Sequence, residues 1–128
     1  MEVLDDPAVN VTGVSPRGRH LYLHVNLRFF REQPAYLTGV LLHEVHHVVL
    51  GHVTADRFQG AAHPDLMQLA MEMSAIEFIR EPFPGQPVLG NDFRECGVDA
   101  RQSTLHCYRL LVSARQTGHV VTVPRGAR

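Results

Sequence analysis

The segment that most constrains the fold is LLHEVHHVVLGH, residues 41–52, which places four histidines and one glutamate in a largely apolar run. Pro34 precedes it at a position that suits the first turn of a helix, and Gly51 suits the C-terminal end of that helix. Apolar residues occur on all sides of the predicted helix, which is typical of a helix buried inside a domain. Titratable groups in such a helix need a partner or a metal ion, because their burial is otherwise costly.

The rest of the chain predicts a small α+β domain. Residues 19–29, RHLYLHVNLRF, alternate apolar and polar residues and predict a strand with one buried face. A second apolar helix is expected from Pro64 until Pro82 stops it, and a third over residues 99–118. Residues 1–18 are weakly patterned, and residues 119–124, HVVTVP, are a candidate short last strand.

Length and composition indicate one domain that spans residues 1–128. The net charge of -1 gives no basic patch for nucleic acid or for an anionic membrane. The N-terminus has no apolar signal region, and no apolar run is long enough to span a bilayer. Cys96 and Cys107 lack CxxC spacing and are interpreted as reduced thiols, so we expect a cytoplasmic protein.

Residues 43–47 match the pattern H-E-x-x-H, with His43, Glu44 and His47 in the defined positions. On a helix, residues four apart lie on one face, so the two histidines can bind one zinc ion. Glu44 lies about 100° round the helix, close enough to reach a metal-bound water. A catalytic zinc ion carries three protein ligands and a water whose pKa falls toward about 7, and a carboxylate then accepts its proton.

The third ligand has several candidates. A metzincin would place a histidine at position 53, which is Val53, so the chain is not a metzincin. His52 faces away from the ligand pair unless the chain breaks at Gly51, and His63 remains a further possibility. Glu72 and Glu77 both lie on the second predicted helix, about 140° apart, so only one of them can face the ion. Glu72 gives H-E-x-x-H followed by 24 residues and a glutamate, the gluzincin arrangement, and is favoured.

Three segments resemble the metallopeptidase domain that bacteria carry beside von Willebrand A-like domains: VLLHEVHHVVLGH, LAMEMSAIEFI and CGVDARQSTLHCYRLL. The resemblance covers most of residues 19–112. Glu72 stands where that family has the aspartate of an Ala-x-Asp motif, and Ile76 replaces the asparagine of its Asn-Glu pair. The resemblance implies zinc binding by His43, His47 and Glu72, with Glu44 as the base.

A second resemblance is to the ImmA/IrrE-type metallopeptidases, which cleave DNA-bound repressors. It is carried by Glu72, Ala75 and Phe78, spaced three residues apart before a proline-rich stop. The third metal ligand of that family begins the same motif, so this resemblance also implies Glu72 as the ligand. The segment after Pro84 is more similar to the first family.

The remaining histidines and aromatic residues have more ordinary interpretations. His46 points about 60° away from the ligand pair and is expected around the site or at the surface. His20 and His24 share one strand face and are either exposed or line a cleft. His106 and Tyr108 are candidate hydrogen-bond donors to a transition state, although Tyr108 suits the core. His119 has no pattern around it, and Cys107 is expected to be a small buried hydrophobe.

Together these features predict a single-domain, zincin-like fold in which a short, mostly antiparallel sheet packs on the H-E-x-x-H helix. The predicted function is that of a zinc-dependent metallopeptidase that hydrolyses a peptide or protein substrate with a metal-activated water. The substrate is expected to add as a strand at the edge of residues 21–25. The alternative is a metal-binding regulatory or interaction module without turnover, in which a fourth protein ligand closes the site.

Overall fold

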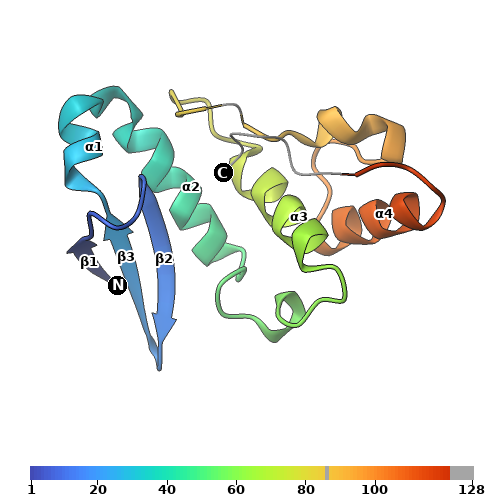
Figure 1. Ribbon diagram of the computed structural model, residues 1–128, viewed down its shortest axis with the longest axis horizontal. Helices are drawn as coiled ribbons and strands as arrows, with labels where there is room; N and C mark the ends of the chain where they lie inside the picture. Colours follow the sequence, from blue (N-terminus) through green and yellow to red (C-terminus); the bar gives the residue numbers. More distant parts are fainter. Residues whose placement is uncertain (86, 122–128) are drawn as a thin grey trace. The chain divides into compact units, whose positions relative to one another are not determined.

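The computed structural model describes residues 1–85 and 87–121. Its elements are β1 (Glu2–Asp5), β2 (Thr12–Arg17), β3 (His20–Val25), α1 (Leu27–Glu32), η1 (Pro34–Tyr36), α2 (Leu37–Val49), η2 (Asp56–Phe58), α3 (Pro64–Ile76), η3 (Gly90–Cys96) and α4 (Thr104–Gln116), where η marks a 3-10 helix (Figure 1). The α+β class is confirmed. The chain divides into two compact units: unit 1 comprises Met1–Thr54 and Ile79–Pro84, and unit 2 comprises the other described residues. The expectation of one domain stays a prediction.

Unit 1 is built on a three-stranded mixed sheet. The strand order is β1-β3-β2, with β1 parallel and β2 antiparallel to β3 (Figure 1). The expectation of a mostly antiparallel sheet is therefore wrong in its detail, because β1 is parallel to β3. The order of the strands was not predicted, since β1 and β2 both arise from residues 1–18, where the sequence pattern is weak. β3 is paired on both sides, so the prediction that a substrate adds to the edge of residues 21–25 is also wrong.

The β2–β3 hairpin turns at Gly18 and Arg19, between the paired residues Arg17 and His20. Gly18 has φ of 60°, the positive value that a two-residue hairpin turn requires at its first position. The period-two prediction for β3 holds at Leu23 and Val25, which are both buried. β3 nevertheless ends at Val25, because Asn26 caps α1 by accepting a hydrogen bond from the Phe29 backbone N–H.

The core of unit 1 joins the inner face of the sheet to α1 and α2. Its buried members are Val11, Leu23, Val25, Phe30 and Val40. The expectation that α2 is buried on all sides is wrong, because Val45 and Val49 are exposed at 46% and 76%. Their i, i+4 spacing makes one solvent-facing stripe, while His43, Glu44 and His47 on other faces are buried.

The ends of α2 agree with the predicted stop and start signals. Pro34 begins the short 3-10 turn η1, and α2 continues directly from it at Leu37. At the other end Gly51 adopts φ of 77°, its N–H donates to the Val48 carbonyl, and the His52 N–H donates to the His47 carbonyl. This pair of bonds is a Schellman motif, which turns the chain back over the last helical turn.

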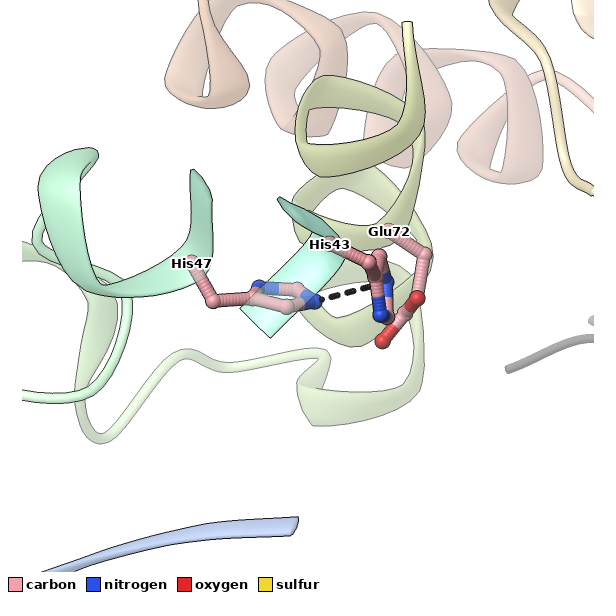
Figure 2. A group of neighbouring side chains, drawn as sticks. All are labelled: His43, His47 and Glu72. Carbon is pink, nitrogen blue, oxygen red and sulfur yellow. Dashed lines mark hydrogen bonds between the residues drawn. The ribbon is translucent and has the colours of Figure 1, made fainter. Parts of the chain in front are cut away.

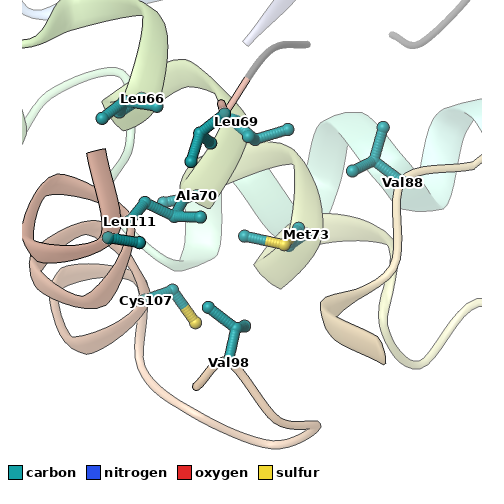
Figure 3. Close-up of a cluster of buried hydrophobic side chains, with 10 residues drawn as sticks. Leu66, Leu69, Ala70, Met73, Val88, Val98, Cys107 and Leu111 are labelled. Carbon is teal, nitrogen blue, oxygen red and sulfur yellow. The ribbon is translucent and has the colours of Figure 1, made fainter. Parts of the chain in front are cut away.

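Unit 2 contains α3 and α4 around its own hydrophobic core (Figure 3). The buried members of this core are Leu66, Leu69, Ala70, Met73, Val88, Val98, Cys107, Leu111, Ala114 and Val121. Ser103 caps α4 by accepting from the His106 N–H, so this helix starts later than residue 99. α3 begins at Pro64 as predicted but ends at Ile76, earlier than the proline that was expected to stop it.

Two further expectations concern the chain end and the membrane. Residues 119–121 are not in a strand, and the rest of the predicted last strand lies outside the described residues. Within residues 1–85 and 87–121, every helix is too short or too polar to cross a lipid bilayer. Cys96 and Cys107 are both free thiols, and burial raises the pKa of each above its ordinary value.

Candidate metal centre

The two histidines of the H-E-x-x-H motif lie side by side on α2. The Nε2 atoms of His43 and His47 are 3.1 Å apart, and the ring centroids are 4.5 Å apart. Both side chains are buried, at 2% and 8% exposure. The i, i+4 spacing on one helix therefore presents two imidazole nitrogens to one point, as the sequence predicted.

His43 is also held by an aromatic contact from outside the helix. The Phe83 ring packs edge-on against the His43 ring, with centroids 5.2 Å apart and an interplanar angle of 72°. Phe83 comes from the segment Ile79–Pro84, which packs with the N-terminal residues in unit 1. Nearby, Gly39 on α2 lies against the backbone of Pro82, at a distance that leaves no room for a Cβ atom. The close approach of this segment to α2 thus brings Phe83 to the histidine.

Glu44 is buried, with 8% exposure, and its carboxylate has a defined partner in the sheet. The Thr12 hydroxyl on β2 donates a hydrogen bond of 2.8 Å to Glu44 Oε1. The same oxygen lies 3.8 Å from His43 Nδ1. A buried carboxylate is costly without a hydrogen-bond donor, and the Thr12 hydroxyl supplies one.

His52 lies beside His47 rather than facing away from it. The Nδ1 atoms of the two rings are 2.9 Å apart, and His52 is 4% exposed. The Schellman motif at Gly51 explains this position, because it folds the chain back at the end of α2. The chain does break from the helix at Gly51, which was the condition under which His52 could turn toward the ligand pair. The Nδ1 atom of His52, however, hydrogen-bonds His47, which is itself a candidate ligand.

Glu72 is a buried carboxylate on α3, with 8% exposure. Gln68, one turn earlier on the same helix, donates through Nε2 to Glu72 Oε1 at 3.0 Å. His43, His47 and Glu72 form a group that could hold a metal ion, with ligand atoms within 4.8 Å of one another (Figure 2). Two imidazoles and one carboxylate are the ligand set that the sequence favoured.

Other candidate residues have different positions. The Glu77 carboxylate accepts a hydrogen bond from the Arg101 backbone N–H in unit 2. His63 precedes α3, and its backbone N–H donates to the Tyr108 hydroxyl at 3.2 Å, so Tyr108 is a half-buried structural residue. The remaining sequence candidates lie outside this group: His46 is half-buried on α2, and His20, His106 and His119 are exposed.

Three residues that contact a candidate ligand or Glu44 were not identified from the sequence. Phe83 contacts His43 and Thr12 contacts Glu44 through long-range packing, for which a single sequence carries no local signal. Gln68 is different, because its i, i+4 spacing from Glu72 on a predicted helix is visible in the sequence. A search for hydrogen-bonding residues one turn from each candidate ligand would have found it.

Comparison with known proteins gives no relative: the sequence matches no protein family, no curated protein and no solved structure. The resemblances to metallopeptidase families therefore stay predictions. The functional interpretation rests on the geometry of His43, His47 and Glu72 and on the contacts of Glu44.

Proposed function

We propose that this protein is a zinc-dependent metallopeptidase with a zincin-like arrangement of a metal-binding helix and a second ligand-bearing helix. The observation that carries the proposal is the convergence of the ligand atoms of His43, His47 and Glu72 within 4.8 Å (Figure 2). The two histidines come from an H-E-x-x-H helix, whose glutamate is the usual general base of this motif. His43, His47 and Glu72 would hold the metal ion.

The donor set suits zinc. Zinc ions favour imidazole nitrogen and carboxylate oxygen in tetrahedral geometry, and two nitrogens on one such ion lie roughly 3.3 Å apart. The Nε2 atoms of His43 and His47 are 3.1 Å apart before any adjustment of the rings. The group of His43, His47 and Glu72 contains no sulfur ligand. The cytoplasmic location of the protein stays a prediction.

A bound zinc ion would supply Lewis-acid polarisation of a peptide carbonyl and an acidified water molecule. Glu44 is the residue proposed to remove the proton from the attacking water and to pass it to the leaving amine. Thr12 hydrogen-bonds Glu44 Oε1, so Oε2 is the oxygen proposed to take the proton. Glu44 is buried, with 8% exposure, on the same helix as His43 and His47.

The test combines metal binding with peptide hydrolysis. Purified protein is expected to bind one zinc ion, measured by elemental analysis and calorimetric titration, and to cleave an unstructured protein such as casein. Glu44→Gln is expected to retain zinc and to lose at least about 10²-fold in hydrolysis, because the amide cannot accept the proton. Zinc binding without hydrolysis in the wild type would instead support the regulatory module.

The ligand assignment has a matched control. Glu72→Gln is expected to weaken zinc binding strongly, because it removes a charged ligand. Glu77 lies on the same stretch of chain, but its carboxylate hydrogen-bonds the Arg101 N–H. Glu77→Gln is therefore expected to leave the zinc affinity unchanged. Equal zinc affinities in Glu72→Gln and wild type would contradict the ligand role of Glu72.

A further inference from the structure

Unit 1 contains a second cluster of reactive side chains on the sheet, separate from the metal-binding group. Ser15 Oγ lies 2.7 Å from His24 Nε2, and His24 Nδ1 lies 3.0 Å from Asp6 Oδ2. The three side chains thus form a chain of hydrogen bonds from a hydroxyl, through both ring nitrogens, to a carboxylate. This connectivity is that of the Ser-His-Asp triad, which is recognised by geometry and roles rather than by position in the sequence.

The sheet topology brings these residues together from three segments. His24 lies on the central strand β3, opposite Gly13 of β2, while Ser15 pairs with Tyr22. Ser15 and His24 are therefore diagonal neighbours on one face of the sheet. Gly13 has no side chain, so the residue directly opposite His24 does not separate its ring from Ser15. Asp6 follows β1, the parallel neighbour of β3.

The Asp6 carboxylate is held in place on both of its oxygens. The Ala8 backbone N–H donates to Oδ1 at 2.9 Å, while His24 contacts Oδ2. The Asp6 N–H also donates to the Val25 carbonyl at 2.9 Å, which anchors this residue to the sheet. The acid is thus fixed by the backbone on one side and presents its other oxygen to the imidazole.

The direction of each hydrogen bond follows from these contacts. An ionised carboxylate can only accept, so His24 Nδ1 carries a proton and donates it to Asp6. In the neutral imidazole Nε2 is then the acceptor, and the Ser15 hydroxyl donates to it. The ring nitrogen that contacts Ser15 is therefore in the form that can remove a proton. Ser15 is only half-buried, and the side chains of His24 and Asp6 are 24% and 30% exposed, so a reagent can approach all three from solvent.

We propose that Ser15, His24 and Asp6 form a metal-independent reactive site in which Ser15 is an activated nucleophile toward acyl and phosphonyl electrophiles. When an alkyl fluorophosphonate reacts, the Ser15 Oγ–P bond forms, the P–F bond breaks and fluoride leaves. The hydroxyl proton passes to His24 Nε2, and Asp6 stabilises the resulting imidazolium. No oxidant or cofactor is required, and the proposal does not depend on the metallopeptidase function.

The experiment treats the full chain with an alkyl fluorophosphonate and maps the modified residue by tandem mass spectrometry. Ser15 is expected to react at least about 10²-fold faster than Ser103, because general-base activation gives rate factors of that size. Ser103 is a suitable internal comparison, since it is exposed and its hydroxyl oxygen accepts from the His106 backbone N–H. The sequence contains no lysine, which removes one source of competing modification.

Two variants test the roles of the partners. His24→Gln removes the base, and Asp6→Asn keeps the shape and the Oδ1 acceptor while allowing the amide to donate to His24 and reverse its tautomer. Each is expected to slow labelling of Ser15 by about 10²-fold or more, with an unchanged circular dichroism spectrum. Ser103→Ala and treatment with a zinc chelator are expected to leave the labelling rate of Ser15 unchanged.

The outcomes separate the hypotheses directly. Equal labelling rates of Ser15 and Ser103 in the wild type would overturn the proposal, even if a variant fails to fold. Fast labelling of Ser15 that persists in Asp6→Asn would show that the hydrogen-bonded chain does not activate it, which also overturns the proposal. Loss of Ser15 labelling on zinc removal would assign the reactivity to the metal centre instead.

Discussion

The Thr12 hydroxyl donates a 2.8 Å hydrogen bond to the Glu44 carboxylate across 32 residues of sequence. This bond links the edge strand β2 to α2 at the glutamate of the H-E-x-x-H motif. Because both residues are buried, the bond is protected from competition with water. Thr12 is thus a positioning residue for Glu44 in the proposed mechanism, since it selects the orientation of the carboxylate.

The first prediction concerns Thr12→Val, which keeps the side-chain shape and removes the hydroxyl. We expect a loss of about 1–3 kcal/mol in the free energy of unfolding of the metal-free protein, because a buried carboxylate loses a donor. We also expect kcat of peptide hydrolysis to fall, with KM and zinc affinity little changed. Urea unfolding and steady-state kinetics measure the two effects.

Thr12→Ser is the matched variant, since it restores the donor with one methyl group fewer. It is expected to recover most of kcat, whereas a role of Thr12 in packing alone would leave kcat unaffected by either change. A kcat in Thr12→Val equal to that of the wild type, in a folded protein, would refute the positioning role.

The second prediction concerns the contact between His52 and His47. If His47 binds zinc through Nε2, its Nδ1 carries a proton and donates to His52 Nδ1 at 2.9 Å. Loss of a partner of this kind commonly lowers metal affinity by about 10–100-fold, because the ligand ring is no longer oriented. We expect His52→Ala to show this loss in calorimetric titration with zinc, and the exposed His106→Ala to show none.

The helix that carries His43 and His47 could be predicted from the sequence because its signals are local. Pro34 and Gly51 mark its two ends, and the spacing of His43 and His47 follows from helical periodicity alone. Glu72 was identified for a related reason, as an acid in an otherwise apolar helix. These features require no knowledge of which segments meet in space.

The sheet and the contacts around the candidate ligands could not be predicted in the same way. β1 and β2 are short strands whose pairing with β3 is decided by long-range contacts, and β1 is exposed throughout. Thr12 reaches Glu44 only because that pairing places β2 beside α2. The position of His52 depends on the Schellman motif at Gly51, which helical periodicity alone does not predict.

The third prediction concerns the pH dependence of stability. Arg115 contacts Asp65 through two hydrogen bonds of 3.2 and 2.7 Å, and this lowers the pKa of Asp65 from its ordinary value of 3.8. A lowered pKa in the folded state means that this stabilisation is present above about pH 4. It is lost as the pH falls through the lowered value. The side chains of Asp65 and Arg115 are 52% and 31% exposed, so the effect is expected to be small and to weaken in high salt.

Asp65→Asn removes the titrating group and tests this expectation. The variant is expected to be slightly less stable than the wild type at pH 7 and equal to it near pH 2, by urea unfolding at both values. Asp56→Asn, a change at an exposed carboxyl in η2, serves as the control. A stability difference between Asp65→Asn and wild type that is the same at both pH values would contradict the assignment.

The fourth prediction concerns Gly39 on α2. Alanine normally stabilises a helix interior by about 1 kcal/mol relative to glycine. At this position the added Cβ would meet the Pro82 backbone carbonyl, which cannot move aside as a flexible side chain could. We therefore expect Gly39→Ala to destabilise the protein by about 1–3 kcal/mol, the usual effect of overpacking, measured by urea unfolding.

The same substitution is expected to weaken zinc binding, because Pro82 adjoins Phe83, whose ring packs against His43. Thr38→Ala at the exposed neighbouring position introduces alanine without a new contact and should leave both stability and zinc affinity within experimental error. If Gly39→Ala proved more stable than the wild type, helix propensity would dominate, and the packing of the Ile79–Pro84 segment on α2 could not be as close as described.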